Sequence, residues 1–183
     1  MLEGTIVFEG KCNGIDIVIR HVRRDDTERL LQFINVISKE QTYILFQGEQ
    51  MTIEEESRYV EGFINKAENH MAVKLLVFHG EEFIGLADII TKERAENHVG
   101  VFGIIITKEW RGKGIGHFLM EKAIEEAKKN ILGLQIITLG VFSNNPVAKK
   151  MYGKKGFKEF GLLPGGIKYK GGLVDHIHMY KKI

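Results

Sequence analysis

The residue types best suited to chemistry form a glycine-rich hexapeptide, Arg-Gly-Lys-Gly-Ile-Gly, at positions 111–116. A strand that ends near Ile106 would lead into this turn, and a helix would begin within it. The start of a helix leaves several backbone N–H groups without partners, and here they would point at one spot. Glycine has no side chain to keep an anion away from the backbone. The hexapeptide therefore predicts a site for a phosphate-bearing ligand.

The spacing of these glycines limits the kind of ligand. It fits neither the G-x-G-x-x-G of dinucleotide sites nor the G-x-x-x-x-G-K-[ST] of P-loops, since His117 follows Gly116 directly. An ordinary helix start, with glycines for close packing, is the alternative interpretation. The hexapeptide alone leaves that alternative open.

A second motif lies about thirty residues farther along the chain. We expect it on the helix that follows the next strand. Asn145 is a good N-cap and Pro146 suits the first helical position, while Gly156 is a typical helix stop. Ala148 and Tyr152 are four residues apart and would lie on one face of that helix. These roles account for the helix itself but not for its pairing with the anion turn.

Together the two motifs resemble those of the GNAT acyltransferase superfamily. The first family motif, R/Q-x-x-G-x-G/A, is matched by Arg111, Gly114 and Gly116. The second, N-x-x-A-x-x-x-Y-x-x-x-G-F, is matched by Asn145, Ala148, Tyr152, Gly156 and Phe157. The resemblance runs from about Ile15 to the end of the chain. Residues 1–14 would form an N-terminal extension that contributes a strand.

The resemblance implies a role for each matched residue, with acetyl-CoA as co-substrate and no metal. Backbone groups of Ile104 and Ile106 would pair with the amides of the pantetheine arm. Asn145 would contact the pantetheine, and Tyr152 would protonate the departing sulfur. The pyrophosphate would be held by the turn that consists of Arg111, Gly112, Lys113, Gly114, Ile115 and Gly116.

The predicted activity is that of an N-acyltransferase, which moves the acetyl group of acetyl-CoA to a primary amine by direct attack in a ternary complex. The acceptor would be an amine-bearing small molecule or peptide, and a homodimer is left open. A non-catalytic acyl-CoA sensor of the same fold is the alternative, although a sensor has no need of the acid Tyr152. The base that deprotonates the amine stays open among His98, Glu93, Asp88, Glu40 and Glu49.

The elements that must position these residues alternate between strands and helices. Helices are expected over 27–39, after the capping box of Thr52 and Glu55, after Gly114, and over 146–155. Strands are expected over 5–9, 15–20, 72–78, 83–90, 99–106, 136–142, 157–162 and 173–180, with a glycine-rich loop between the last two. The helical connection makes 136–142 parallel to 99–106. The fold class is thus α+β and GNAT-like: a mixed, mostly antiparallel sheet of about seven strands, with a splayed parallel pair and helices on both faces.

Composition limits the remaining classes of protein. A chain of 183 residues favours a single domain spanning 1–183. The net charge of +2 is spread along the chain, which does not favour nucleic acid as a partner. The single cysteine, Cys12, suits a reducing compartment, and no apolar run approaches the ~18 residues of a membrane span. His176 and His178 lack a third ligand for a metal. We expect a cytoplasmic protein.

Overall fold

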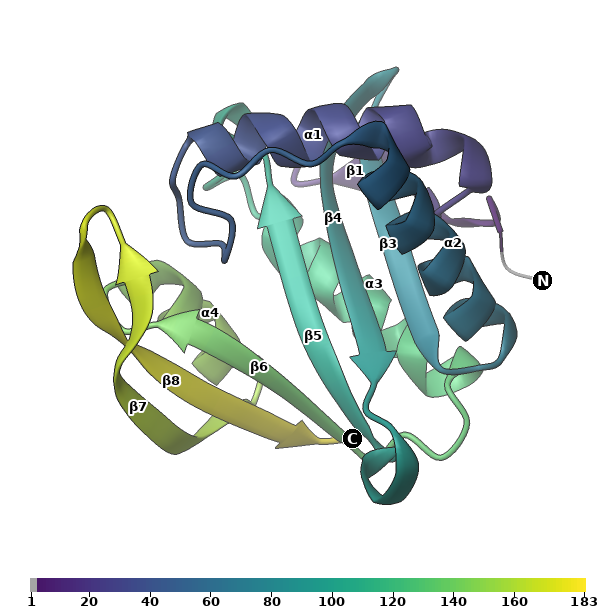
Figure 1. Ribbon diagram of the computed structural model, residues 1–183. Helices are drawn as coiled ribbons and strands as arrows, with labels where there is room; N and C mark the ends of the chain where they lie inside the picture. Colours follow the sequence, from purple (N-terminus) through teal and green to yellow (C-terminus); the bar gives the residue numbers. More distant parts are fainter. Residues whose placement is uncertain (1–2) are drawn as a thin grey trace.

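Among residues 3–183, which the computed structural model describes, eight strands form one open mixed sheet (Figure 1). The strand order is β1-β2-β3-β4-β5-β6-β8-β7, and every neighbouring pair is antiparallel except β5 and β6. The strands are β1 Ile6–Cys12, β2 Ile15–His21, β3 Ala72–His79, β4 Glu82–Thr91, β5 Val99–Ile106, β6 Ile136–Phe142, β7 Lys158–Tyr169 and β8 Gly172–Lys182. The predicted fold class is confirmed. Met1 and Leu2, which begin the expected extension, lie outside the described residues.

Four longer helices cover the two faces of the sheet in the described part of the chain. They are α1 Thr27–Lys39, α2 Ile53–Glu68, α3 Ile115–Asn130 and α4 Pro146–Lys154. Helices α1 and α2 lie in front of the sheet in Figure 1, and α3 and α4 lie behind it. Within residues 3–183, no helix has the length and apolarity needed to cross a membrane.

The alternation of side chains along the strands builds a core on each face. In β3, Val73, Leu75 and Val77 belong to the cluster that includes α3, whereas Leu76 and Phe78 belong to the cluster under α1 and α2. Helix α1 begins and ends as the sequence predicts, and α2 begins as predicted, where the side chain of its N-cap accepts a hydrogen bond from the third helical residue. The sheet is therefore held from both sides.

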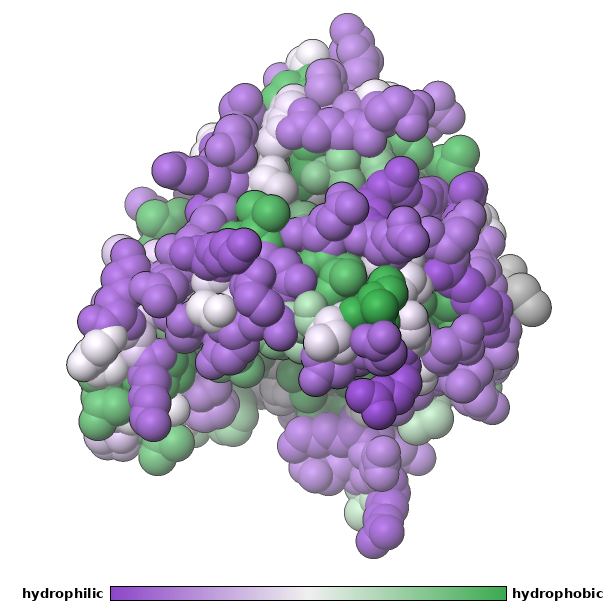
Figure 2. Space-filling model, turned by 45° about the horizontal axis from the view of Figure 1, so that its top comes forward, coloured by the Kyte–Doolittle hydropathy of each residue, from purple (hydrophilic) through white to green (hydrophobic). Residues whose placement is uncertain are grey.

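The prediction of a glycine-rich loop after residue 162 is wrong. Strand β7 continues to Tyr169, and a register shift between Leu163 and Ile167 takes up the Pro-Gly-Gly segment as a bulge. Pro164 has no register partner in β8 and β7 is an edge strand, so its missing N–H leaves no ladder bond unmade. The Gly165 N–H donates to the Asp175 carboxylate at 2.9 Å, which fixes the bulge to β8. Apolar surface shows at the left of Figure 2, where this hairpin lies.

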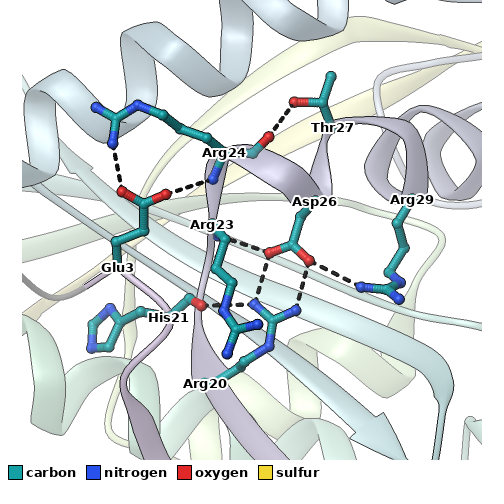
Figure 3. A network of polar contacts seen from close by, with 8 residues as sticks. All are labelled: Glu3, Arg20, His21, Arg23, Arg24, Asp26, Thr27 and Arg29. Atoms are coloured by element: carbon teal, nitrogen blue, oxygen red, sulfur yellow. Dashed lines mark hydrogen bonds and ion pairs between the residues drawn. The ribbon is translucent and has the colours of Figure 1, made fainter.

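A buried ion pair joins β2 to the start of α1 (Figure 3). Asp26 is 1% exposed, and its carboxylate accepts two hydrogen bonds from Arg20 at 2.7 and 2.6 Å. The Arg23 N–H donates to it at 2.7 Å and Arg29 at 3.1 Å. Burial alone would raise the pKa of Asp26, but these donors and charges together lower it. Every oxygen of this carboxylate is thus satisfied by the protein.

Candidate active site

Strands β5 and β6 pair over only part of their lengths. Their parallel ladder joins three residue pairs and ends at Val101 and Thr138. Beyond that point β5 stays paired with β4 through Ile106, and β6 stays paired with β8 through Phe142. The two strands therefore diverge and leave a gap between them, which is visible in Figure 1.

The backbone register shows which groups face this gap. The Thr107 N–H donates to the Ile84 carbonyl at 3.0 Å, so odd-numbered residues of this segment direct their backbone groups toward β4. The His98 carbonyl accepts from the Gln135 N–H at 2.9 Å, so even-numbered residues point toward β6. Ile104 lies past the end of the β5–β6 ladder, and its N–H and C=O consequently face the gap without a strand partner.

The turn between β5 and α3 is open at the helix start. Gly112 and Gly114 have φ of 76° and 85°, a left-handed conformation that glycine adopts without strain. Gly114 is the N-cap of α3, where no side chain caps the first N–H groups and no acidic residue occupies the first turn. A Cβ would meet nothing within 4 Å at Gly112 and only ordinary contacts at Gly116, at 3.7 Å from Ile106. Ile115, which follows Gly114, is buried in the core.

The N-terminal hairpin contacts this turn. The Asn13 side-chain amide, at the β1–β2 connection, donates to the Lys113 carbonyl at 3.0 Å. A Cβ at Gly114 would overlap that amide, so Gly114 is needed for the hairpin contact as well as for its φ. The Lys113 ammonium lies 4.5 Å from the centre of the Trp110 ring, at the surface. The extension therefore braces the turn that the sequence singles out.

Arg111 is engaged by protein groups in this structure. Its Nε donates to the Ile106 carbonyl at 2.8 Å, and its guanidinium contacts Glu40 at 2.7 Å. Ile106 directs its backbone toward the gap, so Arg111 occupies a carbonyl that the sequence assigned to the pantetheine arm. Glu40 directly follows α1, and this ion pair links the glycine turn to the other face of the sheet.

The helix α4 places two of the predicted residues. The Asn145 side-chain oxygen accepts from the Ala148 N–H at 3.1 Å, which is the expected N-cap. Tyr152 is 8% exposed and lies between Phe102 and Phe157, with ring centres 6.3 and 6.1 Å away. Its hydroxyl has no hydrogen-bond partner among residues 3–183. Burial raises the pKa of Tyr152 to about 12, so the phenol keeps its proton.

A single cavity of about 710 Å³ connects the gap with the front face of the sheet. Its wall includes Tyr152 of α4, which lies behind the sheet, and Glu56 of α2, which lies in front of it. The loop between α1 and α2 comes down at the wide end of the gap in Figure 1 and also lines the cavity. Tyr43 of this loop stacks on Tyr169 of β7 at 5.3 Å, while Leu45 is 73% exposed at the rim. The loop thus spans the mouth from α1 to the β7–β8 hairpin.

The front end of the cavity contains a buried lysine. Lys74 of β3 is 3% exposed and contacts the Asp88 carboxylate at 2.9 Å and the Tyr59 hydroxyl at 2.8 Å. Burial alone would lower the pKa of Lys74, but Asp88 and Tyr59 outweigh it and raise the pKa, so the ammonium stays charged. Glu56 is 5% exposed, and its side chain has no hydrogen bond or ion pair within the described residues. Burial raises the pKa of Glu56, and the charge of Lys74 opposes this rise in part.

Of the five candidate bases, the structure brings only Asp88 to the cavity wall. Glu40 is held by Arg111, and Glu49 accepts from the Gln47 N–H. Glu93 and His98 precede β5, at the end of the strand where it is still paired with β6. Asp88 itself is paired with Lys74, as described above.

Sequence reasoning gave too little weight to two histidines of β8 and did not consider Glu56. His176 and His178 share one face of β8, with ring centres 4.2 Å apart, and both line the cavity. A Cβ at Gly140 would overlap the His176 ring, which places that ring against β6 just beyond the end of its ladder with β5. No third metal-ligating side chain joins the two histidines in the described part of the chain. Their spacing of two residues was the signal for a shared face.

Comparison with known proteins finds a family and relatives for this chain. The model of the acetyltransferase (GNAT) family matches residues 34–157. AaaT of Escherichia coli, an L-amino acid N-acetyltransferase, is 34% identical over 102 residues, which span 54% of this chain and 60% of that protein. The chain covers between 34% and 60% of the lengths of the curated relatives that it matches.

Solved structures share the fold over nearly the whole chain. An acetyltransferase of the GNAT family from Streptococcus pneumoniae has a TM-score of 0.82 at 28% identity, covering 91% of this chain and 99% of that one. The protein yncA from Salmonella typhimurium, solved with acetyl-CoA, has a TM-score of 0.77 at 15% identity and covers 91% of this chain and 93% of its own. Identity as low as 15% shows the fold alone.

Proposed function

The chain belongs to the acetyltransferase (GNAT) family, and from that premise we propose that it transfers the acetyl group of acetyl-CoA to a primary amine. The observation that carries this proposal is the gap between β5 and β6. One wall of the gap offers backbone N–H and C=O groups without strand partners, and the uncapped start of α3 lies at its edge. Both are arrangements that acetyl-CoA would satisfy.

The residues present fit acetyl-CoA in two ways. Its pantetheine arm carries two amides, which could pair with the backbone of Ile104 and Ile106 as an added strand would. The pyrophosphate could lie against Gly112 and Gly116, where no side chain blocks the backbone. Use of the Ile106 carbonyl requires Arg111 to leave it, and the freed guanidinium would then be available to a phosphate. Asn145, which caps α4, keeps its amide N–H groups for the pantetheine.

Acetyl transfer requires few catalytic groups from the protein. Acetyl-CoA supplies an activated thioester, and the cavity holds an amine beside it, which lowers the barrier through proximity. Backbone N–H groups of β5 that face the gap can stabilise a developing oxyanion. Tyr152 keeps its proton at neutral pH, and its hydroxyl is free to donate that proton to the departing sulfur.

The amine must lose a proton, and His176 is the group we assign to accept it. Its ring lies against β6 at the point where the gap opens, in the wall of the cavity. Burial, and to a lesser extent the charge of His178, lower the pKa of His176, so the imidazole is neutral and able to accept a proton at pH 7. Asp88 is less suited, because its carboxylate is occupied by the Lys74 ammonium.

Calorimetric titration with acetyl-CoA tests the assigned site. We use Gly116→Val because Gly116 has ordinary φ and room for a Cβ, so the valine projects toward Ile104 and Ile106 without disturbing Asn13. Gly62→Val is the matched control, since Gly62 lies on an exposed part of α2 with nothing within 4 Å. Affinity should fall at least about tenfold in Gly116→Val and stay unchanged in Gly62→Val. Unchanged affinity in both variants would contradict the site.

A further inference from the structure

The charged side chains in the cavity wall are not all paired with one another. Four of the wall's side chains in the described residues are Asp, Glu, Lys or Arg: Glu56, Lys74, Asp88 and Lys92. Lys74 is paired with Asp88 at 2.9 Å, and Lys92 is paired with Glu96 at 2.7 Å. Glu56 alone has neither an ion pair nor a hydrogen bond to its side chain. One carboxylate is therefore left over at the front end of the cavity.

The fold itself does not explain this carboxylate. A buried carboxylate is expensive unless a donor or a cation meets it. The capping box of α2 uses Glu55, not Glu56, and the Lys74 ammonium already has the Asp88 carboxylate and the Tyr59 hydroxyl. Lys74 also lies over the Tyr59 and Phe63 rings, 4.5 and 4.7 Å from their centres. Lys74 acts on Glu56 only through its charge, without a direct contact, so a cation in the cavity would supply a contact that the described residues do not.

The wall between Glu56 and the gap is mostly apolar, and its charged groups, Lys74 and Asp88, are paired with each other. Phe33 of α1, Leu86 of β4 and Ile105 of β5 line the cavity between α2 and the end of the β5–β6 ladder. An acceptor whose amine lies at the gap would therefore pass these apolar side chains, beside the closed Lys74–Asp88 pair, to reach Glu56. Its second polar group would meet a carboxylate there, and a negatively charged group would be repelled.

We propose that Glu56 binds a cationic group of the acceptor, and that the acceptor is a primary amine joined to this second cation by an apolar chain. The inference rests on the acetyl transfer proposed above, which sets where the reacting amine lies. The second cation would form a charge-assisted hydrogen bond with Glu56, replacing the water that each group gives up. Amines with a terminal carboxylate should be poor acceptors.

The test compares three acceptor series of equal chain length: α,ω-diaminoalkanes, n-alkylamines and ω-amino carboxylates. With acetyl-CoA, free thiol release should show the highest kcat/KM for a diamine, at least about tenfold above its matched monoamine. In Glu56→Gln the diamine should lose at least about tenfold, while the monoamine should change by less than about threefold. Glu54→Gln removes the same charge from an exposed position on the same turn and should change neither.

Several outcomes would overturn the inference. An equal loss for diamine and monoamine in Glu56→Gln would make Glu56 a structural residue, and a preference for the amino carboxylate would reverse the charge assignment. If acetyl-CoA binds but no amine releases thiol, the proposed function fails by itself. The Glu56 site is then decided by calorimetry of the diamine on the acetyl-CoA-loaded protein. Binding lost in Glu56→Gln supports the site, and absence of binding to the wild type refutes it.

Discussion

Two buried polar regions of the molecule differ in how completely their groups are paired. In the first, around Asp26, the carboxylate is met by two arginines and a backbone N–H, as Figure 3 shows, with a third arginine nearby. In the second, along the cavity, Glu56 and the Tyr152 hydroxyl have no partner among the described residues. In the first region every oxygen of the carboxylate is satisfied by the protein. In the second region polar groups are left without hydrogen bonds and are available to a ligand.

This difference separates stability from function. A closed network is held in place by its own members, so its loss should destabilise the fold. An unpaired group in a cavity contributes little to stability or opposes it, and natural sites often keep such groups because activity needs them. Variants in the two regions should therefore have effects of opposite kind.

The largest expected effect is on the closed network. Asp26→Asn leaves the buried Arg20 guanidinium without its carboxylate and should lower the free energy of unfolding by about 3–5 kcal/mol. Because the pKa of Asp26 is lowered in the folded state, its contribution is present at neutral pH and is lost as the pH falls through that pKa. Urea titration from neutral to acidic pH measures both. Glu125→Gln, which breaks an exposed pair with Lys122, is the control and should cost at most about 1 kcal/mol.

The next effect is on turnover. Tyr152→Phe keeps the ring between Phe102 and Phe157 but removes the proton donor, so kcat should fall about 100-fold while acetyl-CoA affinity and stability barely move. Steady-state kinetics and melting curves measure these quantities. Pre-steady-state thiol release shows whether chemistry limits turnover. If it does, a variant with wild-type kcat rules out the acid role.

A smaller effect concerns the proton acceptor. Below the lowered pKa of His176 the imidazole is charged and cannot accept a proton, so kcat/KM should fall with decreasing pH on the acid side of ~6.5. His176→Asn should reduce kcat/KM at pH 7 by about tenfold and remove this acid limb. A pH profile of the variant that keeps the wild-type limb would assign the titration to another group.

The smallest effect has the opposite sign to that of Asp26→Asn. Glu56→Gln removes an unpaired buried carboxylate and should raise the free energy of unfolding of the ligand-free protein by about 1 kcal/mol. Because the pKa of Glu56 is raised in the folded state, its cost exists above the unfolded pKa and disappears at lower pH. The gain should therefore be seen at pH 7 and vanish near pH ~4. A loss of stability comparable to that of Asp26→Asn would make the two regions alike.

The parts of the candidate site were not equally predictable. The glycine turn and the α4 motif are short contiguous segments, so residue type and spacing were enough to place them. The polar end joins Glu56, Lys74 and Asp88 from α2, β3 and β4, and no local pattern brings them together. The contact of Arg111 with Glu40 joins residues 71 positions apart, and no local pattern predicts it either.

Local sequence signals predicted some elements of the fold correctly and others not. The capping box of Thr52 and Glu55 gave the start of α2 correctly, because the signal and the structure are both local. The segment around Pro164 to Gly166 reads as a loop by the same rules, yet β8 pairs with it on either side and makes it a bulge. Pairing with a partner strand overrides the preference of those residues.

Thiol release by the wild-type protein with acetyl-CoA and a panel of primary amines tests the central claim most directly, with the products identified by mass. We expect thiol release that depends on the amine, is matched by one N-acetyl product per thiol and is highest for an amine with a second cation. Acetyl-CoA that binds in the gap but releases no thiol with any amine would contradict the account and leave a binding protein of the same fold.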